Sequence, residues 1–182
     1  MTRNLPSAEV FIATSLDGYI ARADGGIDWL VDRPVPEGED FGYATFMAGI
    51  GALVMGRQSF DKALSFPEWP YPVPVVVMSR SPSQVHVPEP LRGRVEVTGA
   101  APDAVLADLA ARGIARVYVD GGQIIRAFLA QGLVRRMIVT LIPVLLGEGR
   151  PLWGHGGADV PLSLRGVRHW PNGFVQVEYG ID

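Results

Sequence analysis

The chain has 182 residues, of which 48% are hydrophobic and 19% are charged, and its formal net charge is −3. A length of this order is typical of one domain, and the apolar fraction is large enough to build a core. Because the sequence contains no cysteine, disulfides, thiolate catalysis and cysteine-based zinc sites are excluded.

Charge and spacing exclude several other kinds of site. Lys and Arg do not form the block that is typical of a nucleic-acid or membrane surface. The three His residues are far apart and lack metal-ligand spacing, and the first residues lack the apolar run of a signal peptide. We therefore expect a cytoplasmic protein that acts on a small-molecule substrate and has no metal, nucleic-acid or membrane partner.

The first half of the chain begins with a predicted buried strand at residues 10–14. A loop over residues 15–30 follows, and its mixture of Asp, Gly and aromatic residues is more typical of a functional loop than of disorder. Apolar residues at helical spacing predict a helix over 39–50. The next expected elements are a strand at 52–55, a helix at 57–64, and strands at 73–79 and 95–98.

In the second half, a helix is predicted over residues 102–112, with Pro near its start and Gly just after its end. A strand at 116–120 leads through paired glycines into a second helix. A long strand at 133–144 precedes a hairpin with strands at 163–170 and 174–179 around a Pro-Asn-Gly turn. This order predicts a single α/β domain: a mixed, mostly parallel central sheet flanked by helices, with a C-terminal antiparallel hairpin.

Two predicted strand-to-helix junctions contain glycine at a position where a ligand could approach. They are Gly56-Arg57-Gln58-Ser59 and Gly121-Gly122-Gln123. Glycine lets the backbone come close to a phosphate, and a helix start offers free N–H groups. Taken alone, each glycine is better explained as an ordinary turn, and Arg57 as a surface residue. Together on one sheet, the two junctions favour a cofactor with more than one phosphate.

A further strand end indicates the kind of cofactor. Ser79 and Arg80 follow a predicted strand, where a site that selects NAD often has an acid for the ribose hydroxyls. A Ser and an Arg at this place suit an extra 2′-phosphate instead. The sequence has no Gly-x-Ser-x-Gly elbow for hydrolysis and no phosphate loop for ATP. Chemistry by a bound redox cofactor is therefore favoured by elimination.

Six segments, in order along the chain, carry a resemblance to a known family: "VFIATSLDGYIA", "DWL", "VMGRQSF", "VVVMSR", "VYVDGGQIIRAFL" and "MIVTLIPVLLGEGRPLW". They resemble the dihydrofolate reductase-like superfamily, and within it the stand-alone relatives of the bacterial RibD C-terminal reductase domain. The resemblance covers residues 10 to about 153. It implies a dihydrofolate reductase-like domain rather than a Rossmann fold, NADPH as the hydride donor, and a homodimer as the common assembly.

The resemblance also implies which residues hold the cofactor, and in such relatives the paired glycines are often joined by a cis peptide. It places Gly56, Arg57, Gln58 and Ser59 at the 2′-phosphate and a neighbouring phosphate, Ser79 and Arg80 beside the adenine ribose, Gly121, Gly122, Gln123, Ile124 and Ile125 under the pyrophosphate, and Thr14, Ile20 and Ala21 near the nicotinamide.

For the substrate, the resemblance implies Asp40, Thr140 and Trp29. A count without gaps from Met55 places Asp40 at the carboxylate that binds the pterin and helps protonation in dihydrofolate reductases. Thr140 matches a Thr beside that carboxylate, and Trp29 matches an aromatic residue at the mouth of the pocket. Asp40 is equally well explained as an acid favoured at a helix start, Trp29 as core packing and Thr140 by strand propensity.

Two departures from the family pattern bear on the substrate. Residues 31–49 are acidic except for Arg33, where RibD-type domains have a basic stretch for a ribose phosphate, and Asp28-Trp29 replaces the Pro-Trp pair of true dihydrofolate reductases. We therefore expect an NADPH-dependent reductase of a small heterocyclic or carbonyl substrate. The alternatives are the aminouracil phosphoribosyl reductase of riboflavin biosynthesis, a dihydrofolate reductase, and a non-catalytic nucleotide-binding protein on the same fold.

Overall fold

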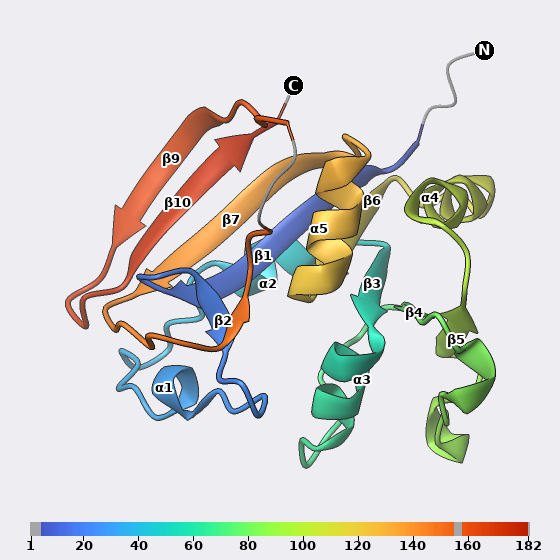
Figure 1. Cartoon of the computed structure of the whole chain (residues 1–182), viewed down its shortest axis with the longest axis horizontal. Coiled ribbons are helices and arrows are strands. Elements are labelled where there is room, and N and C mark those ends of the chain that lie inside the picture. Colours follow the sequence, from blue (N-terminus) through green and yellow to red (C-terminus); the bar gives the residue numbers. More distant parts are fainter. Residues whose placement is uncertain (1–4, 155–157, 182) are drawn as a thin grey trace.

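Eight strands form one sheet, most of it parallel, through the centre of the protein (Figure 1). The structure is a computed structural model, and it describes residues 5–154 and 158–181. The strands of this sheet are β1 (Ser7–Ser15), β3 (Ala52–Gly56), β4 (Val75–Met78), β5 (Val95–Thr98), β6 (Arg116–Asp120), β7 (Val134–Ile142), β9 (Ser163–His169) and β10 (Val175–Gly180).

The strand order is β5-β4-β3-β6-β1-β7-β10-β9. Neighbours are parallel from β5 through to β7, whereas β10 is antiparallel to both β7 and β9. The predicted α/β domain, with a mostly parallel sheet and a C-terminal hairpin, is therefore confirmed. The carboxyl ends of the parallel strands all meet at one edge of the sheet, and this edge carries the two glycine junctions.

Helices cover both faces of the sheet. They are α1 (Asp28–Val31), α2 (Tyr43–Met47), α3 (Arg57–Leu64), α4 (Pro102–Ala111) and α5 (Gly122–Ala130), with 3₁₀ turns η1 (Pro82–Gln84) and η2 (Glu89–Leu91). Successive residues of β3 point to opposite faces: Val54 packs in a core cluster with α4 and α5, whereas Leu53 and Met55 pack in a second cluster with α2 and α3. None of the described helices is long and apolar enough to cross a membrane.

A second, two-stranded sheet lies beside the main one. It consists of β2 (Tyr19–Ala21) paired with β8 (Arg150–Pro151) in antiparallel orientation. The sequence predicts only a loop over residues 15–30, yet this segment contains both β2 and α1. Strands of two or three residues leave no periodic pattern, so this pairing was not predicted.

The predicted helix over residues 39–50 is wrong in extent, because α2 covers only Tyr43–Met47. Phe41 and Gly42 have φ angles of 57° and 84°, in the left-handed region. A right-handed helix cannot pass through this region, so α2 begins only after Gly42. The apolar spacing agrees with α2 but does not reveal the left-handed residues that precede the helix.

An ionic network joins four strands of the sheet at the end where β6 begins. The carboxylate of Glu9 on β1 accepts hydrogen bonds of 2.7 and 2.8 Å from Arg116 on β6, and one of 3.2 Å from Arg136 on β7. Burial alone would raise the pKa of Glu9, but the two guanidinium groups outweigh it and hold the pKa below its ordinary value of 4.5. Arg136 also binds Glu178 on β10, at 2.8 Å.

Replacement of Glu9 by Gln is expected to lower the free energy of unfolding by about 1–3 kcal/mol at neutral pH. A carboxyl group whose folded-state pKa is depressed stabilises the protein above its unfolded pKa, and this stability is lost as the pH falls. The difference in free energy of unfolding between wild type and Glu9→Gln should therefore become smaller below pH 4.5. Urea unfolding of both proteins at neutral and acid pH measures this difference. Glu68→Gln, at an exposed position, is the control. A difference that does not change with pH would contradict the ionic explanation.

Candidate active site

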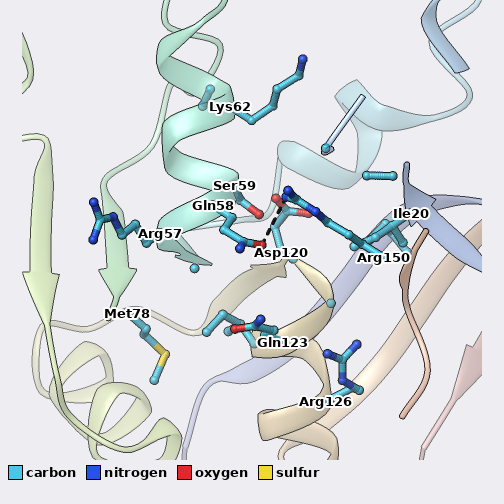
Figure 2. Close-up of a pocket in the computed structure, with 18 of the residues that line it drawn as sticks. Ile20, Arg57, Gln58, Ser59, Lys62, Met78, Asp120, Gln123, Arg126 and Arg150 are labelled. Atoms are coloured by element: carbon cyan, nitrogen blue, oxygen red, sulfur yellow. Dashed lines mark hydrogen bonds between the residues drawn. The ribbon is translucent and has the colours of Figure 1, made fainter. Parts of the chain in front are cut away.

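A cleft of about 890 Å³ opens at the carboxyl ends of β3, β4 and β6. Open parallel sheets bind their ligands at this edge. The starts of α3 and α5 form one wall of the cleft, which we call the inner wall, and β2 with β8 forms the outer wall (Figure 2). The two glycine junctions of the sequence therefore open into one cavity.

At the first junction, β3 passes directly into α3. Gly56 is the last residue of the strand, and no side chain caps the N-terminus of the helix, so the N–H groups of its first turn are available to a ligand. A Cβ on Gly56 would lie 3.2 Å from the Cγ1 atom of Ile124, on α5. Arg57 has an exposed ion pair of 3.6 Å with Asp61, one turn later, which contributes little to stability.

At the second junction, the backbone comes too close to its neighbours for any residue but glycine. Gly121 has a φ of 88°, and a Cβ on it would lie 2.6 Å from the Oγ atom of Ser59. A Cβ on Gly122 would lie 2.8 Å from the carbonyl oxygen of Pro151, on β8. Glycine is therefore required at both places by conformation and contact. The expected cis peptide is not found: no peptide bond of the described residues is cis.

Most residues that the resemblance assigned to the cofactor line this cleft, and two do not. Ile125 is fully buried in the core between α5 and the sheet, and its helical position turns it away from the junction. Thr14 is also buried; its neighbour Ala13 lines the cleft, and successive strand residues point to opposite faces. The predicted residues in the lining are Ile20, Ala21, Gly56, Arg57, Gln58, Ser59, Ser79, Arg80, Gly121, Gly122, Gln123 and Ile124.

Asp40, the predicted proton donor, does not line the cleft. It is exposed, and its carboxylate accepts hydrogen bonds of 2.8 Å from the backbone N–H groups of Ala44 and Gly42. These bonds hold the pKa of Asp40 below its ordinary value. The carboxylate therefore serves the start of α2, and a group with a lowered pKa is a poor proton donor at neutral pH. The structure therefore places Asp40 at the start of α2 and outside the cleft lining, as the alternative of an acid favoured at a helix start predicts.

Thr140 and Trp29, the other predicted substrate residues, also lie outside the cleft lining. The hydroxyl of Thr140 accepts a hydrogen bond of 3.0 Å from the side-chain amide of Gln176 inside the sheet region. The indole of Trp29 is only 5% exposed and packs with Ile142 and Phe174. Both residues are held by structural contacts, as the alternative explanations of strand propensity and core packing predict.

Asp120, which the sequence analysis did not single out, lies on the floor of the cleft. It ends β6 immediately before the paired glycines. Burial raises the pKa of Asp120, and hydrogen bonding by Gly121, Ser59 and Tyr118 opposes that rise without cancelling it. The signal in the sequence was an acid at a strand end next to a glycine pair, which is where carboxyl groups with perturbed pKa values often occur.

Three tyrosines surround this carboxyl group. Burial raises the pKa of each phenol, and the nearby charge of Asp120 raises it further. Tyr71 and Tyr118 both line the cleft, and the hydroxyl of Tyr118 donates a hydrogen bond of 2.8 Å to the carbonyl oxygen of Phe11. These residues come from distant segments, Tyr43, Tyr71 and Tyr118, so only the folded chain reveals the cluster.

The sequence model of the RibD C-terminal domain matches residues 6–176. The chain belongs to the RibD C-terminal domain family. Domains of this family are reductases, which assigns the chain to the oxidoreductases. Among curated proteins, the uncharacterized protein YwjB of Bacillus subtilis is 30% identical, over 93% of this chain and 95% of that protein.

Solved structures share the RibD-type fold. A protein of Shewanella sp. PV-4, described as a candidate riboflavin biosynthesis protein, is 37% identical with a TM-score of 0.90, covering 97% of this chain and 99% of that one. A bifunctional deaminase and 5-amino-6-(5-phosphoribosylamino)uracil reductase of Thermotoga maritima is 17% identical, with a TM-score of 0.74. The match covers this whole chain but 58% of the Thermotoga chain, and at this identity it shows the fold.

The cleft of this RibD-type domain is positively charged, although the chain as a whole is negative. Among the described residues that line it, Asp120 is the only acid, and such a cleft attracts anionic ligands. No group of three or more His, Asp or Glu residues in the described part of the chain is arranged to hold a metal ion. The basic residues of the lining are Arg57, Lys62, Arg80, Arg126 and Arg150.

Proposed function

We propose that this RibD-type protein is an NADPH-dependent reductase of a small heterocyclic or carbonyl substrate. The observation that carries the proposal is Asp120, a shielded carboxyl group with a raised pKa on the floor of a positively charged cleft. NADPH supplies a hydride when it is bound, and such a reduction also needs a proton. A simple nucleotide-binding module would have no use for a half-buried acid with a raised pKa at this place.

The lining of the cleft fits the phosphates of such a cofactor. At Gly121 and Gly122 the space that a Cβ would fill is closed by Ser59 and Pro151, so the backbone itself forms the surface. The uncapped first turn of α3 offers N–H groups to an anion. Arg57 and Arg80 stand at the ends of β3 and β4, where guanidinium groups suit the additional 2′-phosphate.

Asp120 is the residue to which we assign the proton. A carboxyl group donates best when its pKa lies near the working pH, and burial moves the pKa of Asp120 in that direction. In its protonated form it can donate to a ring nitrogen or carbonyl oxygen of the substrate. The phenol of Tyr71, also in the lining, is placed to assist in binding the same polar edge.

Apolar and aromatic side chains in the cleft lining offer a place for the substrate ring. They come from four different segments of the chain: Phe11, Leu30, Phe66 and Tyr71. A flat ring against such side chains displaces water, and exclusion of water strengthens the electrostatic interactions of Asp120 with the substrate. These side chains therefore support a heterocyclic substrate more than a flexible one.

NADPH is expected to bind more tightly than NADH, and replacement of Arg57 by Ala should reduce the difference by roughly tenfold or more. The guanidinium of Arg57 stands at the helix start next to Gly56. Among the described residues its only ion pair is the exposed contact of 3.6 Å with Asp61, which is weak. Titration of both cofactors into both proteins measures the difference. Affinity for NADH should stay the same, and equal affinities in wild type would argue against NADPH.

The direct test of the proposed function is NADPH oxidation in the presence of a panel of substrates. The panel should contain aminopyrimidines, pteridines and small ketones or aldehydes, each with wild type and with Asp120→Asn. Oxidation that depends on a panel member and on Asp120 supports a reductase. Tight NADPH binding with no oxidation by any member would favour the non-catalytic alternative.

A second candidate is the reduction of a phosphoribosylated aminouracil. The observation that favours it is Lys62, a basic side chain in the cleft lining whose Nζ atom lies 5.9 Å from the centre of the Phe66 ring. Lys62 provides a positive charge for a substrate phosphate, in addition to Arg33 of the mostly acidic segment 31–49. Comparison of one aminopyrimidine with and without its ribose phosphate decides between the candidates, because only the second candidate predicts a strong preference for the phosphate.

A further inference from the structure

Arg150 connects the two walls of the cleft. It belongs to β8 in the outer wall, and its Nη1 atom donates a hydrogen bond of 3.2 Å to the Oε1 atom of Gln58 in the first turn of α3 (Figure 2). Its Nε atom donates to the carbonyl oxygen of Ala23 at 3.4 Å. The long side chain thus crosses from β8 to the helix start of the inner wall.

The charge of Arg150 is not neutralised by a carboxylate. Arg22, Arg57 and Arg112 each lie within 4 Å of an acid, but among the described residues no acid lies that close to Arg150. An amide oxygen and a carbonyl oxygen are its partners. Neutral acceptors bind a guanidinium less strongly than an anion does, so Arg150 keeps most of its attraction for a ligand phosphate.

The surroundings of Arg150 leave room for the guanidinium and hold its strand in place. A Cβ on Gly25 would lie 3.1 Å from both terminal nitrogens of Arg150, so glycine at this position makes the space available. On the other side, Arg126 of α5 donates hydrogen bonds of 2.6 and 3.2 Å to the carbonyl oxygens of Pro151 and Leu152. The backbone of β8 is therefore fixed to α5, while the guanidinium group of Arg150 can exchange its hydrogen-bond partners.

We propose that Arg150 binds the diphosphate group that NADPH and NADH share, and that it exchanges Gln58 for phosphate oxygens when a cofactor enters. The inference rests on the proposed function, because it assumes a dinucleotide at the starts of α3 and α5. It assigns Arg150 a role different from that of Arg57: Arg57 distinguishes the two cofactors, whereas Arg150 binds both equally. Arg150 is then the residue that closes the outer wall over the bound molecule.

The test is a titration of NADPH and NADH into wild type, Arg150→Ala and Arg57→Ala. Arg150→Ala should weaken binding of both cofactors by the same factor, roughly tenfold to hundredfold, and Arg57→Ala should weaken NADPH alone. Binding to wild type should also depend more steeply on salt than binding to Arg150→Ala. Arg92→Ala removes the same charge from an exposed position just before β5 and should leave both affinities unchanged.

Each other outcome overturns a specific statement. Wild-type affinities in Arg150→Ala would show that the contact with Gln58 only joins the walls, and the reductase proposal would stand. A loss confined to NADPH would move Arg150 to the 2′-phosphate and remove its role at the diphosphate. Failure of wild type to bind either cofactor would end both proposals. If Arg150→Ala does not fold, Arg150→Met keeps the aliphatic stem and should show the same equal loss.

Discussion

Replacement of Asp120 by Asn is expected to lower turnover by a factor of about 10²–10⁴, with little change in NADPH affinity. The amide keeps the size of the carboxyl group and part of its hydrogen bonding, but it cannot donate and recover the proton. Asp120 is the only acid among the described residues that line the cleft, and burial raises its pKa. Steady-state kinetics with a substrate from the panel, together with a cofactor titration, measures the effect.

Asp40→Asn is the matched control for this experiment. Its carboxylate accepts two backbone hydrogen bonds at the start of α2, outside the cleft lining. The amide keeps one acceptor oxygen but loses the negative charge near the helix start, which is worth about 0.3–1 kcal/mol in stability, so this variant should melt slightly lower and turn over normally. The opposite result, with Asp40→Asn inactive and Asp120→Asn active, would restore the hypothesis drawn from the family resemblance.

The pH dependence of stability independently tests whether the pKa of Asp120 is raised. Its folded-state pKa is raised above the ordinary value of 3.8, so the folded protein binds this proton more tightly than the unfolded chain does. The free energy of unfolding therefore falls as the pH rises from that ordinary value through the raised one. Asp120→Asn removes this contribution and should make the protein more resistant to urea at neutral pH. The proton transfer itself should slow over the same rise in pH.

Replacement of Gly122 by Val is expected to abolish NADPH binding while the protein still folds. A Cβ at this position would lie 2.8 Å from the carbonyl oxygen of Pro151 and 3.1 Å from the Nη1 atom of Arg126. Arg126 holds the same carbonyl oxygen at 2.6 Å, so β8 cannot move away without losing that bond. The branched side chain would therefore displace β8 and obstruct the junction that holds the phosphates.

Gly166→Val is the control for this substitution, because no heavy atom lies within 4 Å of a Cβ built at Gly166 on β9. Circular dichroism should show a folded protein for both variants, and a cofactor titration should show binding for the control alone. A folded Gly122→Val protein with wild-type NADPH affinity would mean that the glycine pair only makes a turn.

The features that sequence could predict are those that depend on neighbouring residues. The ranges of α3, β5 and β6 agree with the prediction, because an apolar run that stops at glycine and is followed by polar residues determines both a strand end and a helix start. The two glycine junctions are local signals of the same kind. Their meeting in one cleft follows from the rule that parallel strands end at the same edge of a sheet.

The features that sequence could not predict depend on residues far apart. The pairing of β2 with β8 joins Tyr19 to Pro151, and no local pattern records it. The count that selected Asp40 assumed an unbroken helix, but the reversal at Phe41 and Gly42 breaks it. Asp120 was visible next to the glycine pair, yet what raises its pKa is burial, which only the folded chain provides.

The strand order has a consequence for the way in which this protein folds. β6 lies between β1 and β3 in the sheet, although it is the sixth strand along the chain. In the sheet, β1 pairs with β6 and β7, and both of these strands follow residue 115 in the chain. The first strand therefore has no partner while the N-terminal half is synthesised. Long-range pairing of this kind slows folding and leaves apolar residues exposed for longer. The acid and the glycine pair of the inner wall arrive with β6, and β8 of the outer wall follows only at residue 150, so a nascent chain completes its binding site after the centre of its sheet.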